Sequence, residues 1–93
     1  NSGKYTGKEN QEKTILKVNE EATEEIAKQL RLRDIDGIII IDYIDMSREE
    51  SKLKIIETLK QNIKKDRSKI QILEFTKLNL LEITRKHMFS NKI

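Results

Sequence analysis

LRLRDIDGIIIIDYIDM, residues 30–46, is the segment that decides the fold of this chain. Its four consecutive isoleucines, at 38–41, are typical of a strand buried in an α/β sheet, because β-branched side chains favour extended backbone. Gly37 precedes them in a turn and is free to adopt a positive φ. Asp42 follows them, at the end of the strand where open α/β sheets bind their ligands. Asp42 is therefore the first candidate for chemistry, and a turn or helix-capping role is its alternative.

Two helices are expected around this strand. The first spans residues 11–33, after a polar loop at 1–9 and a cap at Asn10. The second spans residues 48–66, opened by a capping box in which Ser47 caps the helix and Glu50 reaches back. The buried face of the first helix is predicted from apolar residues spaced by three and four: Ile15, Val18, Ala22, Ile26 and Leu30.

Three strands are expected, at residues 38–44, 70–75 and 80–85. The last two are close enough to form a hairpin, and Asn79 in the turn tolerates the left-handed conformation. Two strands joined through a helix should be parallel, with a right-handed crossover. The predicted class is α/β, with two long helices and a small partial sheet of about three strands, two of them parallel and one antiparallel at the edge. Residues 1–93 form at most one small domain, with a flexible tail at 88–93.

Composition excludes several classes of function. The chain has no cysteine and one histidine, His87, so neither a disulfide framework nor a zinc site is expected. Its longest apolar run, at 38–41, is too short to span a membrane, and no apolar signal segment opens the chain, so the cytoplasm is expected. A net charge of +3 permits a nucleic-acid partner without indicating one by itself.

Asp42 has the chemistry of a magnesium ligand, because Mg²⁺ takes one or two carboxylates and keeps several waters. Metal-assisted phosphodiester hydrolysis requires a second acid. Asp45 lies three residues on and faces the opposite side of a regular strand, so it is assigned to the turn. Asp34 and Asp36 lie at the other end of the strand and are assigned structural roles. The basic cluster Lys64, Lys65, Arg67 and Lys69 is either a helix C-terminus stabilised by its dipole or a phosphate-binding edge.

Residues 30–46 resemble the signature of the ribonuclease E/G family of bacterial endoribonucleases. The similarity continues in KKDRSKIQILEFTKLNLLEITRKH, residues 64–87, and through residues 1–34. The resemblance implies that the chain is a fragment of the catalytic region, from the part called the DNase I-like subdomain. It also implies a Mg²⁺-dependent endoribonuclease that cleaves single-stranded RNA in RNA processing and decay.

The resemblance assigns roles to individual residues. Asp42 matches the second metal-binding acid, and Asn1 matches the Asn of an Asp-(Ile/Val)-Asn-Ser motif whose acid would precede residue 1. The isolated fragment is therefore expected to be inactive. Lys69, with Arg67 beside it, matches a basic RNA contact, although the strand order places Lys69 at the opposite edge from Asp42. The family usually has Gly-Gly where this chain has Asp36-Gly37, a difference that affects the turn.

The implied partners are single-stranded RNA and the remainder of the parent catalytic region. A rival hypothesis is a non-enzymatic module for oligomerisation or RNA contact, since an exposed sheet edge pairs readily with another copy. A third is an unrelated α/β binding module. A parent sequence without an acid two residues before Asn1 would favour that third hypothesis.

Overall fold

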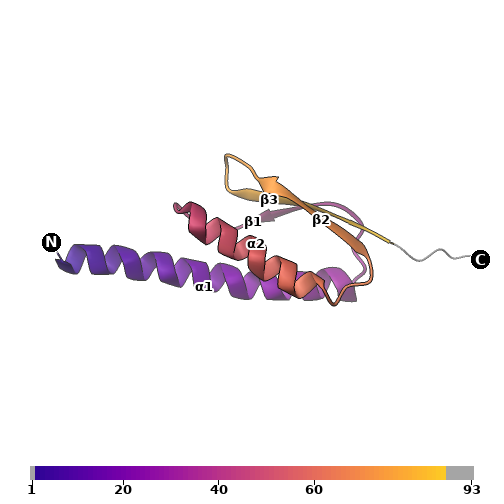
Figure 1. Ribbon diagram of the computed structural model, residues 1–93, viewed down its shortest axis with the longest axis horizontal. Coiled ribbons are helices and arrows are strands. Elements are labelled where there is room, and N and C mark those ends of the chain that lie inside the picture. Colours follow the sequence, from indigo (N-terminus) through magenta and orange to yellow (C-terminus); the bar gives the residue numbers. More distant parts are fainter. Residues whose placement is uncertain (1, 88–93) are drawn as a thin grey trace, which may run out of the picture.

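Two helices lie on one side of a three-stranded sheet in the computed structural model, which describes residues 2–87 and the side chains of residues 7–87 (Figure 1). The expected tail at 88–93 lies outside the described residues. The elements, in chain order, are α1 (Ser2–Leu32), β1 (Gly37–Asp42), α2 (Glu49–Ile63), β2 (Lys69–Phe75) and β3 (Leu80–Lys86).

The sheet has the order β1-β3-β2, and both pairs of neighbouring strands are antiparallel. The predicted parallel pair is therefore wrong, and the antiparallel strand lies at the centre of the sheet rather than at its edge. Asn79, at φ 63°, turns the chain so that β3 folds back along β2. The other edge of β3 then pairs with β1. β1 and β2 consequently run in the same direction but are separated by β3.

Strand β1 is covered on one face only. Ile41 is 6% exposed, whereas Ile38 is 77% exposed and Ile40 is 49% exposed. Successive side chains in a strand point to opposite faces, and both helices cover the same face of this sheet. The prediction of a strand buried on both sides is therefore wrong for the part of the chain that the structure describes.

Helix α1 is longer than predicted, and the centre of its buried face lies about one residue from the predicted position. It begins at Ser2, so the expected loop at residues 1–9 and the cap at Asn10 are wrong. A glycine inside a helix costs only about 1 kcal/mol, and no proline interrupts this segment. Val18, expected in the core, is 43% exposed. Leu30 is buried as predicted, and Ile15 and Ile26 are partly buried against the core. The other buried residues of α1 are Asn19, Thr23 and Ala27.

Helix α2 lacks the predicted capping box. Its N-cap is Arg48, which makes no capping bond with its side chain. Ser47, one residue earlier, donates its hydroxyl to Glu12 Oε2 on α1 at 2.6 Å instead. The serine therefore links the two helices rather than closing the start of α2.

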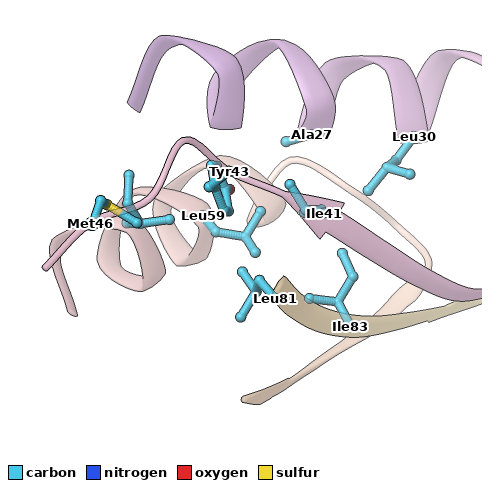
Figure 2. Close-up of a cluster of buried hydrophobic side chains, with 9 residues drawn as sticks. Ala27, Leu30, Ile41, Tyr43, Met46, Leu59, Leu81 and Ile83 are labelled. Carbon is cyan, nitrogen blue, oxygen red and sulfur yellow. The ribbon is translucent and has the colours of Figure 1, made fainter. Parts of the chain in front are cut away.

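The hydrophobic core lies between the helices and the inner face of the sheet (Figure 2). Ile55 and Leu59 of α2 and Leu81 and Ile83 of β3 are completely buried. Ile41 of β1 and Leu30 of α1 complete the same cluster. Among residues 2–87, neither helix has a stretch long and apolar enough to cross a membrane.

Candidate functional site

Asp42 is the last residue of β1, and its carboxylate is exposed on the open face of the sheet. Its neighbours Ile41 and Tyr43 are 6% and 4% exposed and point into the core. Because side chains alternate along extended backbone, burial of these two neighbours directs Asp42 outward. The acid predicted from the isoleucine run is thus accessible, at the end of a strand with a packed inner face.

Beyond Asp42 the chain is held by helix α1 rather than by the sheet. Asn19 donates its Nδ2 to the carbonyl of Ile44 at 2.9 Å, and the Ile44 amide donates to Asn19 Oδ1 at 3.2 Å. The Asn19 side chain therefore engages both main-chain groups of one residue. It does so while almost wholly buried, at 2% exposure.

A second buried pair fixes the ring of Tyr43. The Thr23 hydroxyl donates to the main-chain carbonyl of Asn19 at 2.7 Å, so it accepts from the Tyr43 hydroxyl at 2.6 Å. Burial raises the pKa of the Tyr43 phenol, and its bond to Thr23 offsets part of that rise. Tyr43 therefore remains a neutral donor in this pair at physiological pH.

At this end of β1 the described residues offer a metal ion the exposed carboxylate of Asp42. Carboxylate oxygen is the donor that Mg²⁺ prefers, and one or two carboxylates with several waters complete its shell. Asp45 is exposed, three residues past Asp42 and beyond the end of β1. Among residues 2–87 no three acidic or histidine side chains gather into a group that could hold a metal without further ligands. Asn1, the other predicted metal residue, lies outside the described residues.

The predicted RNA-binding residues lie together at the opposite end of the sheet. Arg67 is exposed in the turn between α2 and β2, and Lys69 is the first residue of β2. Lys69 stands directly opposite Lys86 of β3, and both are exposed. Adjacent like charges on paired strands repel each other. This corner of the sheet therefore exposes the cationic side chains of Arg67, Lys69 and Lys86.

Asp42 and Lys69 share the open face but not one site. Asp42 pairs with Leu80 and Lys69 pairs with Lys86, so the two positions are six residue steps apart along β3. At about 3.4 Å per residue this is about 20 Å. The structure places the predicted acid and the predicted basic residues apart, as strand order indicated.

Arg85 of β3 is a buried structural centre at 3% exposure. It donates to both carboxylate oxygens of Asp66 at 2.9 and 3.0 Å, to Asp34 Oδ1 at 2.9 Å and to the carbonyl of Ile35 at 3.0 Å. The bonds from Arg85 hold the pKa of Asp66 below its usual value, and those from Asp66 and Asp34 raise the pKa of Arg85. His87 Nδ1 lies 3.0 Å from the same Asp34 oxygen.

These contacts confirm the structural role predicted for Asp34 and explain its backbone. Asp34 adopts φ 52°, the left-handed region that aspartate tolerates better than most residues. The turn that carries it is tied to β3 through Arg85. Sequence reasoning missed Arg85, Asn19 and Thr23, since each is a polar residue buried at a position where periodicity indicates an apolar side chain or a solvated one.

The comparisons with known proteins agree with one another. The model of the Ribonuclease E/G family matches residues 1–88. The chain belongs to the Ribonuclease E/G family. Among its relatives, Ribonuclease G of Salmonella typhimurium is 48% identical over 86 residues, which is 92% of this chain and 18% of that protein. Ribonuclease E of Synechocystis is 43% identical over 91 residues, 98% of this chain and 14% of that protein.

A plant relative extends the comparison. The chloroplastic Ribonuclease E/G-like protein of Arabidopsis thaliana is 46% identical over 78 residues, 84% of this chain and 8% of that protein. The chain thus spans less than one fifth of the length of these Ribonuclease E/G relatives. The family resemblance found in the sequence is confirmed.

Proposed function

We propose that this chain is part of the catalytic region of an endoribonuclease that cleaves single-stranded RNA in RNA processing and decay, in the cytoplasm. Membership of the Ribonuclease E/G family supports the reaction class. The single observation that supports the site is the exposed carboxylate of Asp42 at the end of β1, between two buried neighbours.

Asp42 is proposed as one ligand of a catalytic Mg²⁺, with Asn1 as a second ligand and an acid from the remainder of the catalytic region as the partner of Asp42. A bound Mg²⁺ supplies a more acidic water and offsets charge on the phosphate undergoing attack. The contribution of this chain is to hold one anionic oxygen ligand on a packed strand and to leave its outward side open to RNA. Zinc is not proposed for this chain, which has no cysteine.

The chain alone is proposed to be inactive. Asp42 has no group of acidic or histidine partners within residues 2–87, and one carboxylate holds Mg²⁺ weakly. The missing ligand would come from the remainder of the catalytic region. Mg²⁺-dependent RNA cleavage by the purified 93-residue chain, abolished by Asp42→Asn, would contradict this proposal.

The test of function uses the longer protein that contains this chain. Wild type and Asp42→Asn are incubated with single-stranded RNA and Mg²⁺, and RNA binding is measured in parallel. We expect cleavage to fall by several orders of magnitude while binding is retained, because asparagine keeps the shape and removes the charge. Asp45→Asn is the matched control and is expected to retain cleavage. Unchanged cleavage in Asp42→Asn would mean that Asp42 is structural.

A second candidate role is self-association through the edge strand β1 and its exposed face. Ile38, Ile40 and Ile44 are 77%, 49% and 50% exposed on or just beyond the same edge strand. An exposed apolar edge strand readily pairs with another copy. Light scattering of the chain at high concentration is expected to show a dimer that Ile38→Lys converts to a monomer. A monomeric mass for the unaltered chain would exclude this role.

A further inference from the structure

We propose that Asn19 is a positioning residue for Asp42: its buried carboxamide fixes the main chain two residues beyond Asp42 and thereby sets the direction of that carboxylate. The inference rests on the proposed function, because it concerns the geometry of the proposed metal ligand. Asn19 lies on α1, far from Asp42 in the sequence, and its side chain makes two hydrogen bonds with the main chain of Ile44.

The sheet itself cannot hold the chain at this point. Asp42 pairs with Leu80, which is the first residue of β3, so the ladder between β1 and β3 ends there. Tyr43 and Ile44 continue past the sheet without a strand partner in the described structure. Asn19 supplies the missing partner, since its amide offers one donor and one acceptor, as a peptide group does.

The burial of Asn19 makes its hydrogen bonds to Ile44 energetically important. Asn19 is 2% exposed, beside the apolar core of α1 and the sheet. A buried amide is costly unless its hydrogen bonds are made, and an aliphatic side chain would fill the same space at less cost. The amide is therefore explained by what it binds, which is the main chain of Ile44.

The next turn of α1 also holds the segment that follows Asp42. Thr23 lies four residues after Asn19, on the same face of the helix. Its hydroxyl binds the Tyr43 hydroxyl and the Asn19 carbonyl. The ring of Tyr43 and the main chain of Ile44 are thus both tied to α1. With Ile41 packed on the other side, the outward direction of Asp42 is fixed from both neighbours.

A metal ligand needs such fixation, because a site functions only when its ligands are held within about 0.5 Å of the productive geometry. Residues that orient metal ligands cost about 10–100-fold in metal affinity or activity when they are changed. Asn19 is expected to act in this way. A merely structural asparagine would affect thermal unfolding and leave metal affinity unchanged.

The experiment uses the longer protein and the variant Asn19→Asp. This change keeps the acceptor for the Ile44 amide and replaces the donor with an anionic oxygen facing the Ile44 carbonyl. Leu30→Ala is the matched control, since it removes a buried side chain from the same helix, about three turns away. Mg²⁺ binding without RNA is measured by calorimetry, together with the Mg²⁺ dependence of cleavage, the KM for RNA and thermal unfolding.

Both variants are expected to unfold at lower temperature, but only Asn19→Asp should weaken Mg²⁺ binding, by about tenfold or more, with an unchanged KM for RNA. Wild-type Mg²⁺ affinity in Asn19→Asp, or an equal loss in Leu30→Ala, would overturn the inference. If Asn19→Asp does not fold, Asn19→Ser, whose hydroxyl reaches only one of the two main-chain groups, is judged by the same criteria.

Asp42→Asn in the same titration separates this inference from the proposed function. Loss of Mg²⁺ binding in Asp42→Asn with normal binding in Asn19→Asp would overturn the role of Asn19 alone. Unchanged Mg²⁺ binding in Asp42→Asn would overturn both.

Discussion

Arg85 connects strand β3 to the turns that follow helices α1 and α2. Its guanidinium, 3% exposed, joins β3 to the turn after α1 through Asp34 and to the turn after α2 through Asp66. Burying a cation is favourable only when its donors are paired with good geometry. Here the pairing with Asp66 is bidentate, which is the strongest form of such a contact.

Removing Asp66 is therefore expected to cost more than removing Asp34. Asp66→Ala leaves a buried guanidinium without its main partner and should lower the free energy of unfolding by about 3–5 kcal/mol. Asp34 has a side chain that is 47% exposed, so the loss of its ion pair in Asp34→Asn should cost about 1 kcal/mol or less. Urea unfolding of both variants tests this order, and equal losses would contradict the central role of Asp66.

The same pair predicts a dependence of stability on pH. The pKa of Asp66 is lower in the folded chain than in the unfolded chain, so its ionised form stabilises the fold at neutral pH. This stabilisation is lost as the pH falls from about 4 through the lowered pKa of the folded state. Urea unfolding between pH 6 and pH 3 should show a smaller loss for Asp66→Asn than for wild type. Parallel plots of the free energy of unfolding against pH for the two proteins would contradict the lowered pKa of Asp66.

Arg67 and Lys69 are expected to contact RNA phosphates. Both residues are exposed and Lys69 lies opposite Lys86, so three cationic side chains are accessible at this corner of the sheet. The salt dependence of single-strand binding is the slope of log K against log salt concentration. Each lost phosphate contact should reduce the magnitude of this slope by about 0.7. Lys69→Ala in the longer protein should show this change, and Lys60→Ala on the exposed side of α2 should not. An unchanged salt slope in Lys69→Ala would contradict the RNA contact.

At the scale of elements, the helices and strands were predictable because their signals are local. The isoleucine run gave β1, and the hairpin turn at Asn79 was confirmed by its φ of 63°. Gly37 likewise adopts the positive φ that was expected, 107°. Strand order was not predictable, since nothing in β3 shows that both of its edges find partners. The buried face of α1 was predicted one residue away, because Asn19 and Thr23 are polar residues buried for their hydrogen bonds.

The start of α2 offers a test of capping. Ser47 does not cap this helix, and the N-cap position is held by Arg48 without a side-chain bond. Arg48→Asp should stabilise the fold by about 0.5–2 kcal/mol, since aspartate caps well and its charge suits a helix N-terminus. Ser47→Ala should change the free energy of unfolding by less than about 0.5 kcal/mol, because its bond to Glu12 is exposed. Urea unfolding measures both changes. A larger loss of unfolding free energy in Ser47→Ala would contradict the minor role of Ser47 at the start of α2.

At the scale of the whole molecule, the two helices leave one sheet face open, with Asp42 at one end and Lys69 at the other. The sequence identified both residues, through the strand-end acid and the family resemblance. It could not show that they share a face, because that follows from the register of β3 with both neighbours. An RNA strand lying along this face would approach both ends, and a second copy paired there would exclude it.

The proposed catalytic role of this chain depends on the exposed Asp42 carboxylate acting as a metal ligand. Its most direct test is a calorimetric Mg²⁺ titration of the longer protein, comparing wild type with Asp42→Asn in the absence of RNA. We expect the variant to lose Mg²⁺ binding while its thermal unfolding stays close to wild type, because the Asp42 side chain is exposed. Wild-type Mg²⁺ affinity in Asp42→Asn would contradict it.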